Sequence, residues 1–199
     1  MTPIIGILHP GAMGLSVAAS AQNSGCTVYW ASEGRSPQTT ERAARIGLPD
    51  AHSLAELCRT CSVIFSVCPP AAAEAQANDV LALGFKGLYV DMNAIAPQRV
   101  ERIAAKMAAH GTRFVSGSII GGPAWQPNST WLYLSGEDAQ SVADCFTAGP
   151  LETQVLGDDI RKATALKMCF AAYTKGTTAL LAAVMAAAEA LNEIGRAHV

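Results

Sequence analysis

Short apolar segments alternate with helical segments over the first 120 residues, and this alternation constrains the fold more than any other feature of the sequence. The strand-like segments are residues 4–8, 27–31, 63–67, 87–91 and 113–119. Helices are predicted between them, at about 12–24, 37–46, 53–59, 70–82 and 97–109. Such alternation is typical of a parallel sheet with helices on both faces. The sequence therefore predicts an α/β fold with a doubly wound, mainly parallel sheet.

The pattern changes after Gly122. A strand is predicted at 129–136, a helix at 136–146 and a strand at 153–156. One Ala-, Leu- and Met-rich helical segment then runs from about 158 to 192, broken at Gly176. Because this helix lacks a consistent polar face, we expect it to pack against another helical layer or another chain.

The composition narrows the choice of partner and compartment. Half of the residues are hydrophobic, the net charge is −2, and Lys and Arg form no runs. The sequence therefore predicts a small-molecule partner, with no nucleic acid and no membrane. The start carries no secretory signal pattern, so we expect a cytoplasmic protein. Cys58 and Cys61 form a lone C-x-x-C, which we interpret as packing residues rather than a zinc or redox site; no metal is predicted.

The first strand runs into the turn "HPGAMG" and then into a helix rich in small residues. Gly11 and Gly14 occupy the second and third positions of a dinucleotide-binding G-x-G-x-x-G pattern, and His9 stands at the first. Backbone N–H groups and the helix dipole favour a pyrophosphate at such a turn. A plain strand-to-helix turn is the alternative. The turn predicts a Rossmann-type fold that binds a dinucleotide.

The loop after the second strand bears on the choice between NAD and NADP. It reads Ser32-Glu33-Gly34-Arg35-Ser36. Glu33 would accept a hydrogen bond from a ribose 2′-hydroxyl and favour NAD, whereas Arg35 with Ser32 and Ser36 would hold a 2′-phosphate and favour NADP. We favour NADP, with NAD and an ordinary loop as the alternatives.

Four segments resemble a known family in order and spacing. "GILHPGAMG" is similar to the G-x-M-G turn of the β-hydroxyacid dehydrogenases, relatives of 6-phosphogluconate dehydrogenase. "IFSVCPP", "VDMNAIAP" and "GSIIGGPAW" resemble later segments of that family. "GSIIGGPAW" and "ALKMCFAAYTKG" are most similar to its subgroup of NAD-binding phosphogluconate dehydrogenase-like proteins. The resemblance covers residues 3–190. It implies an NAD(P)-dependent oxidoreductase that transfers hydride between nicotinamide and a small hydroxy acid.

The resemblance also assigns cofactor residues. It places Gly11, Ala12, Met13 and Gly14 around the pyrophosphate and Val67, Cys68 and Pro69 beside the adenosine. Asn93 falls near the nicotinamide ribose, where the family has a serine. An amide both donates and accepts, so Asn93 would orient the ring. A helix cap before Pro97 is the alternative for this residue.

Lys167 lies where the family has its catalytic lysine. Its apolar surroundings would lower its pKa and permit general acid–base chemistry, with a snorkelling lysine as the alternative. The resemblance implies that Gly121 and Gly122 anchor the substrate acid. Ile120 replaces the family's serine, and Ser118 is expected to substitute for it.

These assignments divide the chain into three parts. Residues 1–157 are predicted to form an NAD(P)-binding Rossmann domain, and 158–192 the first helix of a truncated all-α domain that builds a homodimer in relatives. Residues 193–199 match one reading frame of a sequencing adapter, so we expect a non-native tail. Two alternative functions stay open, a non-catalytic NAD(P)-binding sensor and an imine-type reductase on the same scaffold.

Overall fold

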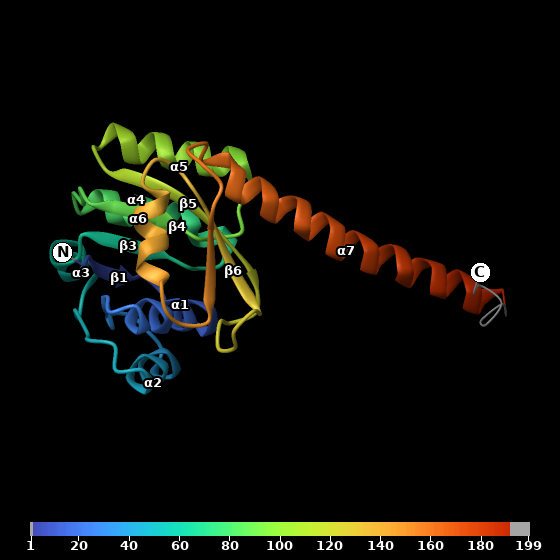
Figure 1. Cartoon of the computed structure of the whole chain (residues 1–199), viewed down its shortest axis with the longest axis horizontal. Helices are drawn as coiled ribbons and strands as arrows, with labels where there is room; N and C mark the ends of the chain where they lie inside the picture. Colours follow the sequence, from blue (N-terminus) through green and yellow to red (C-terminus); the bar gives the residue numbers. More distant parts are fainter. Residues whose placement is uncertain (1, 192–199) are drawn as a thin grey trace.

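The computed structural model describes residues 2–191, and the tail predicted at 193–199 lies outside this range. Seven strands form one sheet in the order β2-β1-β3-β4-β5-β6-β7 (Figure 1). The strands are β1 (Ile4–Ile7), β2 (Thr27–Trp30), β3 (Val63–Ser66), β4 (Leu88–Asp91), β5 (Arg113–Gly121), β6 (Thr130–Ser135) and β7 (Leu151–Val155). β1 to β5 are parallel; β6 runs antiparallel to β5 and parallel to β7. The predicted doubly wound, mainly parallel sheet is confirmed.

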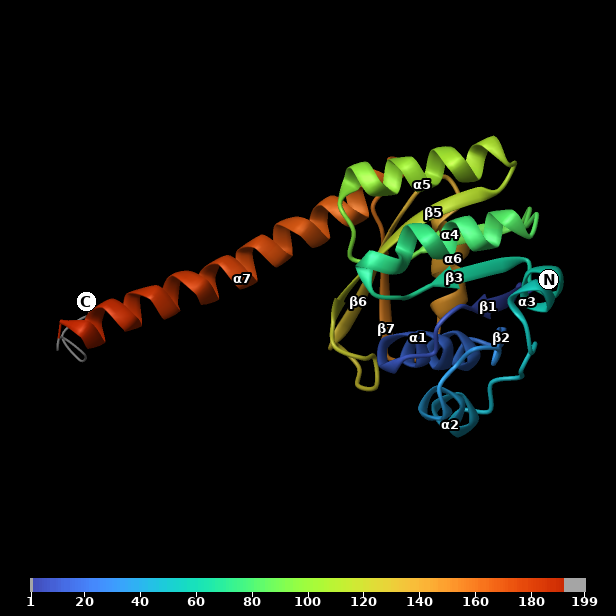
Figure 2. The same ribbon diagram turned by 180° about the vertical axis from the view of Figure 1, so that it is seen from behind.

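Helices cover both faces of the sheet (Figures 1 and 2). They are α1 (Ala12–Asn23), α2 (Pro37–Arg45), α3 (Leu54–Thr60), α4 (Ala73–Ala82), α5 (Pro97–Ala109), α6 (Ala139–Ala143) and α7 (Arg161–Ala190), with short 3₁₀ turns at Pro70–Ala72 and Asp144–Phe146. One core holds the apolar residues of α1 and α6, and the other those of α3, α4 and α5. β3 and β4 are buried along their whole length, as expected for central strands of a two-sided sheet.

The strand order fixes where a ligand can bind. β1 pairs with β2 on one side and with β3 on the other, so the chain crosses over the sheet between them. Loops that leave the carboxyl ends of β1 and β3 therefore diverge and leave a crevice at this edge. The glycine turn after β1 lies at this crevice.

The C-terminal helix α7 is 30 residues long and extends away from the sheet (Figure 1). It continues without interruption through Gly176, in agreement with the prediction of one long helix. A single glycine costs about 1 kcal/mol in a helix, and the Ala- and Leu-rich neighbours outweigh that cost. Only Ala163 and Thr164 of α7 are buried. By length and composition α7 could cross a membrane, a test that core helices of soluble proteins also pass.

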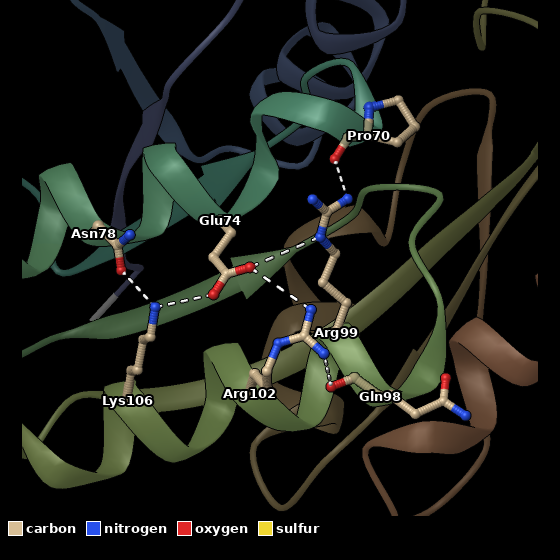
Figure 3. Close-up of polar contacts among 7 residues, drawn as sticks. All are labelled: Pro70, Glu74, Asn78, Gln98, Arg99, Arg102 and Lys106. Carbon is tan, nitrogen blue, oxygen red and sulfur yellow. Dashed lines mark hydrogen bonds and ion pairs between the residues drawn. The ribbon is translucent and has the colours of Figure 1, made fainter.

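An ion-pair cluster ties α4 to α5 and reaches the loop beside the crevice (Figure 3). The Glu74 carboxylate lies 2.9 Å from Nζ of Lys106 and 3.8 Å from Arg99 and Arg102. Arg99 also donates to the carbonyl of Pro70 at 3.0 Å. The cluster thus holds the end of the β3 loop against α5.

Glu74→Gln is expected to lower the melting temperature by about 1–3 °C at low salt, because three cations lose their shared carboxylate. The hydrogen bond from Lys106 lowers the pKa of Glu74. The contribution is therefore present at neutral pH and is lost as the pH falls below the ordinary range of a glutamate. Thermal melts in low and high salt test this, with Glu101→Gln, which removes a carboxylate near Arg161 alone, as the control. A difference that persists in about 1 M salt would contradict an electrostatic origin.

Candidate functional site

The two glycines of the first turn have different structural roles. A Cβ built on Gly14 would lie 2.1 Å from the carbonyl oxygen of His9, so any side chain there would push α1 away from the end of β1. A Cβ on Gly11 would meet no atom within 4 Å. Gly11 is the N-cap of α1 and has extended backbone angles that other residues also adopt. Gly14 is therefore required for packing, whereas Gly11 leaves space over the start of the helix.

A cavity of about 450 Å³ opens at this turn. The loops after β1, β2 and β3 line it, because parallel strands bring their carboxyl ends to one edge. Its lining includes most of the predicted cofactor residues, namely Gly11, Ala12, Met13, Gly14, Arg35, Ser36, Val67, Cys68 and Pro69. His9, Gly34 and Thr39 line it too and were not predicted.

Three predicted cofactor residues do not line this cavity, namely Ser32, Glu33 and Asn93, and Asn93 lines a neighbouring one instead. The backbone N–H of Ser32 donates to Oδ1 of Asp50 at 3.1 Å, which turns the loop after β2 toward the α3 side. Glu33 is exposed, and its N–H donates to the carbonyl of His52 at 2.8 Å. The acid that would favour NAD therefore lies outside the cavity lining, and the arginine that would favour NADP lies within it.

The charges at the cavity favour an anion. Nδ1 of His9 and Nε of Arg35 are buried without a hydrogen-bond partner in residues 2–191. Burial, followed by repulsion from Arg35, lowers the pKa of His9 to about 4. The lining contains neither Asp nor Glu, and the first turn of α1 adds free backbone N–H groups. An oxyanion such as a phosphate would satisfy these donors.

A second cavity of about 200 Å³ adjoins the first. Met13, Val67 and Cys68 line both, so the two spaces share a wall between the turn after β1 and the loop after β3. Asn93, Gly121 and Lys167 line the far side of the second cavity. The predicted phosphate residues and the predicted catalytic lysine thus line two neighbouring cavities.

Asn93 is 3% exposed and holds the β3 loop in place. Its Oδ1 accepts from the backbone N–H of Cys68 at 2.6 Å, and its Nδ2 donates to Oγ of Ser66 at 3.0 Å. The alternative of a helix cap is wrong, because Ala96 is the N-cap of α5. The amide side chain faces the second cavity while it fixes the backbone of the wall that both cavities share.

Lys167 reaches the second cavity from the start of α7. Its Nζ donates to the carbonyl of Ile119 at 2.7 Å and lies 6.0 Å from the ring centroid of Phe170. Burial lowers the pKa of Lys167, and Lys175 lowers it further. No ion pair fixes this ammonium within the described part of the chain. Two hydrogen bonds anchor the start of α7, which carries Lys167. The backbone N–H of Ala163 donates to Oγ of Ser135 at 3.2 Å, and the Thr164 hydroxyl donates to the carbonyl of Ile95.

Of the three predicted substrate residues, one lines the second cavity and two do not. Gly121 lines the second cavity, and its positive φ of 124° and the close carbonyl of Ser129 exclude a side chain. Gly122 does not line it; its carbonyl accepts from Thr130 at 2.7 Å. Ser118 is buried, and its hydroxyl has no partner within residues 2–191. Strand alternation directs Ser118 to the opposite face of β5 from Ile119, so it lies outside the cavity lining.

Asp91, at the end of β4, is a buried acid beneath this site. Its Oδ1 accepts from the N–H of Asn93 at 2.9 Å, and its Oδ2 has no partner in the described residues. Burial raises the pKa of Asp91 to about 6. A group whose pKa is raised on folding stabilises the fold below its unfolded pKa, and that contribution is lost as the pH rises through the folded value.

Asp91→Asn is therefore expected to raise the free energy of unfolding at pH 7 by up to about 3 kcal/mol and to leave it nearly unchanged at pH 4. The variant keeps the acceptor for the N–H of Asn93 and removes the buried charge. Denaturant unfolding from pH 4 to 8 measures this. Asp159→Asn is the control with the opposite sign, since hydrogen bonds from Arg161 hold the pKa of Asp159 at about 2. Equal pH profiles for wild type and Asp91→Asn would contradict the assignment.

A cavity of about 590 Å³ lies at the opposite, amino-terminal edge of the strands. It is lined by residues such as Cys26, Arg113 and Cys145 and contains none of the predicted site residues. Arg113 and Asp138 close part of it through a 2.6 Å ion pair. Among residues 2–191, no three His, Cys, Asp or Glu side chains lie close enough together to hold a metal ion. The chemistry-bearing residues therefore gather at the carboxyl edge.

The sequence matches the NAD-binding domain of 6-phosphogluconate dehydrogenase over residues 4–148. A curated relative, an uncharacterized 28.5 kDa protein of Methanothermus fervidus, is 28% identical over 163 residues, which are 81% of this chain. The matched region is 62% of that relative, so the chain spans less than two thirds of its length.

Several solved structures share the fold. A conserved protein of unknown function, described as similar to 3-hydroxyacid dehydrogenases, is 29% identical with a TM-score of 0.77, over 94% of this chain and 70% of its own. The 3-hydroxyisobutyrate dehydrogenase of Mycobacterium tuberculosis with L-serine is 20% identical, with a TM-score of 0.77 over 97% and 67%. An imine reductase of Myxococcus stipitatus with NADP⁺ is 19% identical, with a TM-score of 0.78 over 96% and 68%. At 19–20% identity the likeness concerns the fold alone.

Proposed function

Because the chain belongs to the family of the NAD-binding domain of 6-phosphogluconate dehydrogenase, we propose that it binds NADP(H) and transfers hydride between nicotinamide and a small hydroxy acid. Two neighbouring cavities carry this proposal, because Arg35 lines one, Lys167 lines the other, and an extended ligand that spans their shared wall would contact both. NAD(H) is the alternative cofactor.

The residues of the first cavity fit a dinucleotide. Gly11 leaves room for a phosphate over the start of α1, and the buried Nδ1 of His9 and Nε of Arg35 lack partners in the described residues. Val67 and Cys68 form the wall between the cofactor's two halves, and Asn93 fixes that wall. A neighbour with the same fold carries NADP⁺, and a variant of it carries NAD⁺, so the scaffold accepts either.

A bound nicotinamide supplies the hydride acceptor or donor. Lys167 supplies the proton transfer that must accompany it. In oxidation the neutral amine takes the proton of the substrate hydroxyl, and in reduction the ammonium returns a proton to the carbonyl oxygen. Burial, which lowers the pKa of Lys167, brings the neutral form closer to the working pH. The carbonyl of Ile119 orients Nζ toward the cavity.

Two observations support a hydroxy acid as the substrate. Gly121 exposes backbone at the second cavity where a side chain is excluded, so a carboxylate can approach it. Neighbours with this fold include a 3-hydroxyisobutyrate dehydrogenase. The sequence also favours a homodimer in the cytoplasm, and the exposed apolar side chains of α7 support pairing with another helical layer. They include Phe170, Tyr173, Leu180, Leu181, Val184 and Met185.

Imine reduction is a second candidate. Ser118 lies outside the second cavity and Ile120 replaces the family serine, so a side-chain hydroxyl for a carboxylate is lacking in the described lining. A substrate without a carboxylate, such as a cyclic imine, would need none. The imine reductase fold matches as well as that of the hydroxy acid enzyme.

A substrate screen separates these candidates. Absorbance of the reduced nicotinamide is followed with small hydroxy acids, their oxo acids and cyclic imines, each with NADP(H) and NAD(H). Turnover with hydroxy acids supports the main proposal, and turnover with imines alone supports the second. Tight nucleotide binding with no turnover of any substrate would favour a non-catalytic sensor.

A further inference from the structure

We propose that His9 selects NADP(H) over NAD(H), acting with Arg35 as a paired ligand for the 2′-phosphate of the cofactor. This inference rests on the proposed nucleotide site and names a determinant within it. In the G-x-G-x-x-G pattern this position is a glycine, which has no side chain to contact a ligand.

The positions of the two residues carry the inference. His9 follows β1 and Arg35 follows β2, and the two strands are adjacent and parallel. Both residues line the 450 Å³ cavity. Nδ1 of His9 and Nε of Arg35 are each shielded from solvent without a partner in residues 2–191. Unsatisfied buried polar groups are costly, and a phosphate in the cavity would satisfy both nitrogens if the imidazole, protonated on Nδ1, and the guanidinium turn toward it.

The surrounding charges identify that acceptor as an anion. The titratable residues that line the cavity from the loops after β1, β2 and β3 are His9, Arg35 and Cys68. Burial raises the pKa of the Cys68 thiol, so it stays neutral and supplies no negative charge. Glu33 is exposed outside the lining. Nothing acidic in the lining competes with an incoming phosphate for the imidazole and the guanidinium.

The position next to β2 distinguishes the 2′-phosphate from the pyrophosphate. The pyrophosphate is expected over the first turn of α1, at Gly11 to Gly14. The group after the second strand is the one that reads the adenosine ribose. Arg35 lies there and lines the same cavity as His9. Its positive charge lowers the pKa of the imidazole. Ser36 and Thr39, whose hydroxyl oxygens lie 3.1 Å apart, complete that end of the cavity.

His9 is expected to take up a proton when NADP⁺ binds. Burial and Arg35 keep the free imidazole neutral at pH 7, since they lower its pKa to about 4. A phosphate next to His9 offsets the charge of Arg35 and favours the imidazolium. We therefore expect NADP⁺ to bind more tightly as the pH falls from 8 to 6, and NAD⁺ to show a smaller change.

Two variants of the full chain test the role of His9. His9→Gly restores the glycine of the common pattern, and His9→Gln keeps a hydrogen-bonding side chain that cannot become charged. Calorimetry is done with NADP⁺, NAD⁺ and the fragment 2′,5′-ADP. Both variants are expected to bind NADP⁺ and 2′,5′-ADP about tenfold more weakly, as for the loss of a hydrogen bond to a charged group. NAD⁺ affinity is expected to stay within about twofold, and melting curves confirm the fold.

Proton uptake is the second readout. Titrations of NADP⁺ in buffers with different ionisation heats give the number of protons bound. A phosphate monoester itself titrates near pH 6, so the informative quantity is the uptake by wild type minus that by His9→Gln. This difference is expected to be positive with NADP⁺ and close to zero with NAD⁺.

Equal losses for NAD⁺ and NADP⁺ in folded variants would overturn the assignment, because they would place His9 at a part common to both cofactors. Unchanged NADP⁺ affinity in both variants would overturn it too. If the wild type binds NAD⁺ without preferring NADP⁺, His9 does not select the cofactor. The proposed hydride transfer would then use NAD(H), the alternative cofactor. Wild type that binds neither nucleotide would contradict both.

Discussion

Lys167→Met is expected to lower turnover by about 10²–10⁴-fold, the range that general acid–base catalysis contributes. Methionine is unbranched like lysine and suits the apolar surroundings of this half-buried position, so α7 should keep its docking. The affinity for NADP⁺ is expected to stay within about threefold, since Lys167 lines the second cavity and not the first. Steady-state rates with the substrate found in the screen, and calorimetry with NADP⁺, measure the two effects.

The same role of Lys167 predicts how the wild-type rates of oxidation and reduction change with pH. Oxidation needs the neutral amine, so its rate should rise with pH through an ionisation below the ordinary lysine pKa, because burial lowers the pKa of Lys167. Reduction needs the ammonium and should slow over the same range. Lys167→Arg keeps the charge but does not release its proton, so it is expected to be as impaired as Lys167→Met in oxidation. Full activity in either variant would exclude Lys167 as the acid–base group.

Gly14→Ala and Gly11→Ala are expected to fail in different ways, and the pair separates packing from ligand binding. The methyl group at Gly14 would lie 2.1 Å from the carbonyl oxygen of His9, which is backbone and cannot rotate away. We expect Gly14→Ala to lower the free energy of unfolding by about 1–3 kcal/mol and to displace α1. Nucleotide binding should be lost with it, because the N–H groups of the helix move.

Gly11→Ala meets no atom within 4 Å and adopts the same backbone angles. We expect its stability to fall by no more than about 1 kcal/mol, the usual cost of alanine at an N-cap. Its affinity for NADP⁺ should nevertheless fall about 100-fold, because the methyl group fills the space where backbone and phosphate must approach. Denaturant melts and calorimetry on both variants test the pair. Normal nucleotide affinity in a folded Gly11→Ala protein would mean that the turn has only a structural role.

Most of the fold could be predicted because local patterns and tertiary packing agree. The apolar runs at 4–8 and 63–67 end within one residue of β1 and β3, where the chain turns toward the crevice. The long final helix follows the same rule: α7 is continuous from Arg161 to Ala190, because the helix propensity of its neighbours outweighs the cost of Gly176.

The site was less predictable from sequence. The glycine turn, Arg35 and Lys167 come together because parallel strands deliver their loops to one edge, which the alternation of strands and helices implies. Ser32 and Glu33 lie outside the cavity lining. Their backbone N–H groups donate to Asp50 and His52, which are distant in sequence, and no local pattern indicates these hydrogen bonds. Ser118 lies on the other face from the cavity, since strand alternation groups it with Ile120 and not with Ile119. His9 was noted as a departure from a pattern, and only its buried, unpartnered nitrogen suggests a contact with a ligand.

Amide hydrogen exchange of the chain with and without saturating NADP⁺ tests the central claim most directly, because it reports which edge of the sheet holds the nucleotide. We predict slower exchange at residues 11–14, 34–36 and 67–69, which line the cavity at the carboxyl edge. Exchange around Cys26 and Cys145, at the larger cavity of the amino edge, should not change. Protection confined to that amino edge, or none anywhere, would contradict the account.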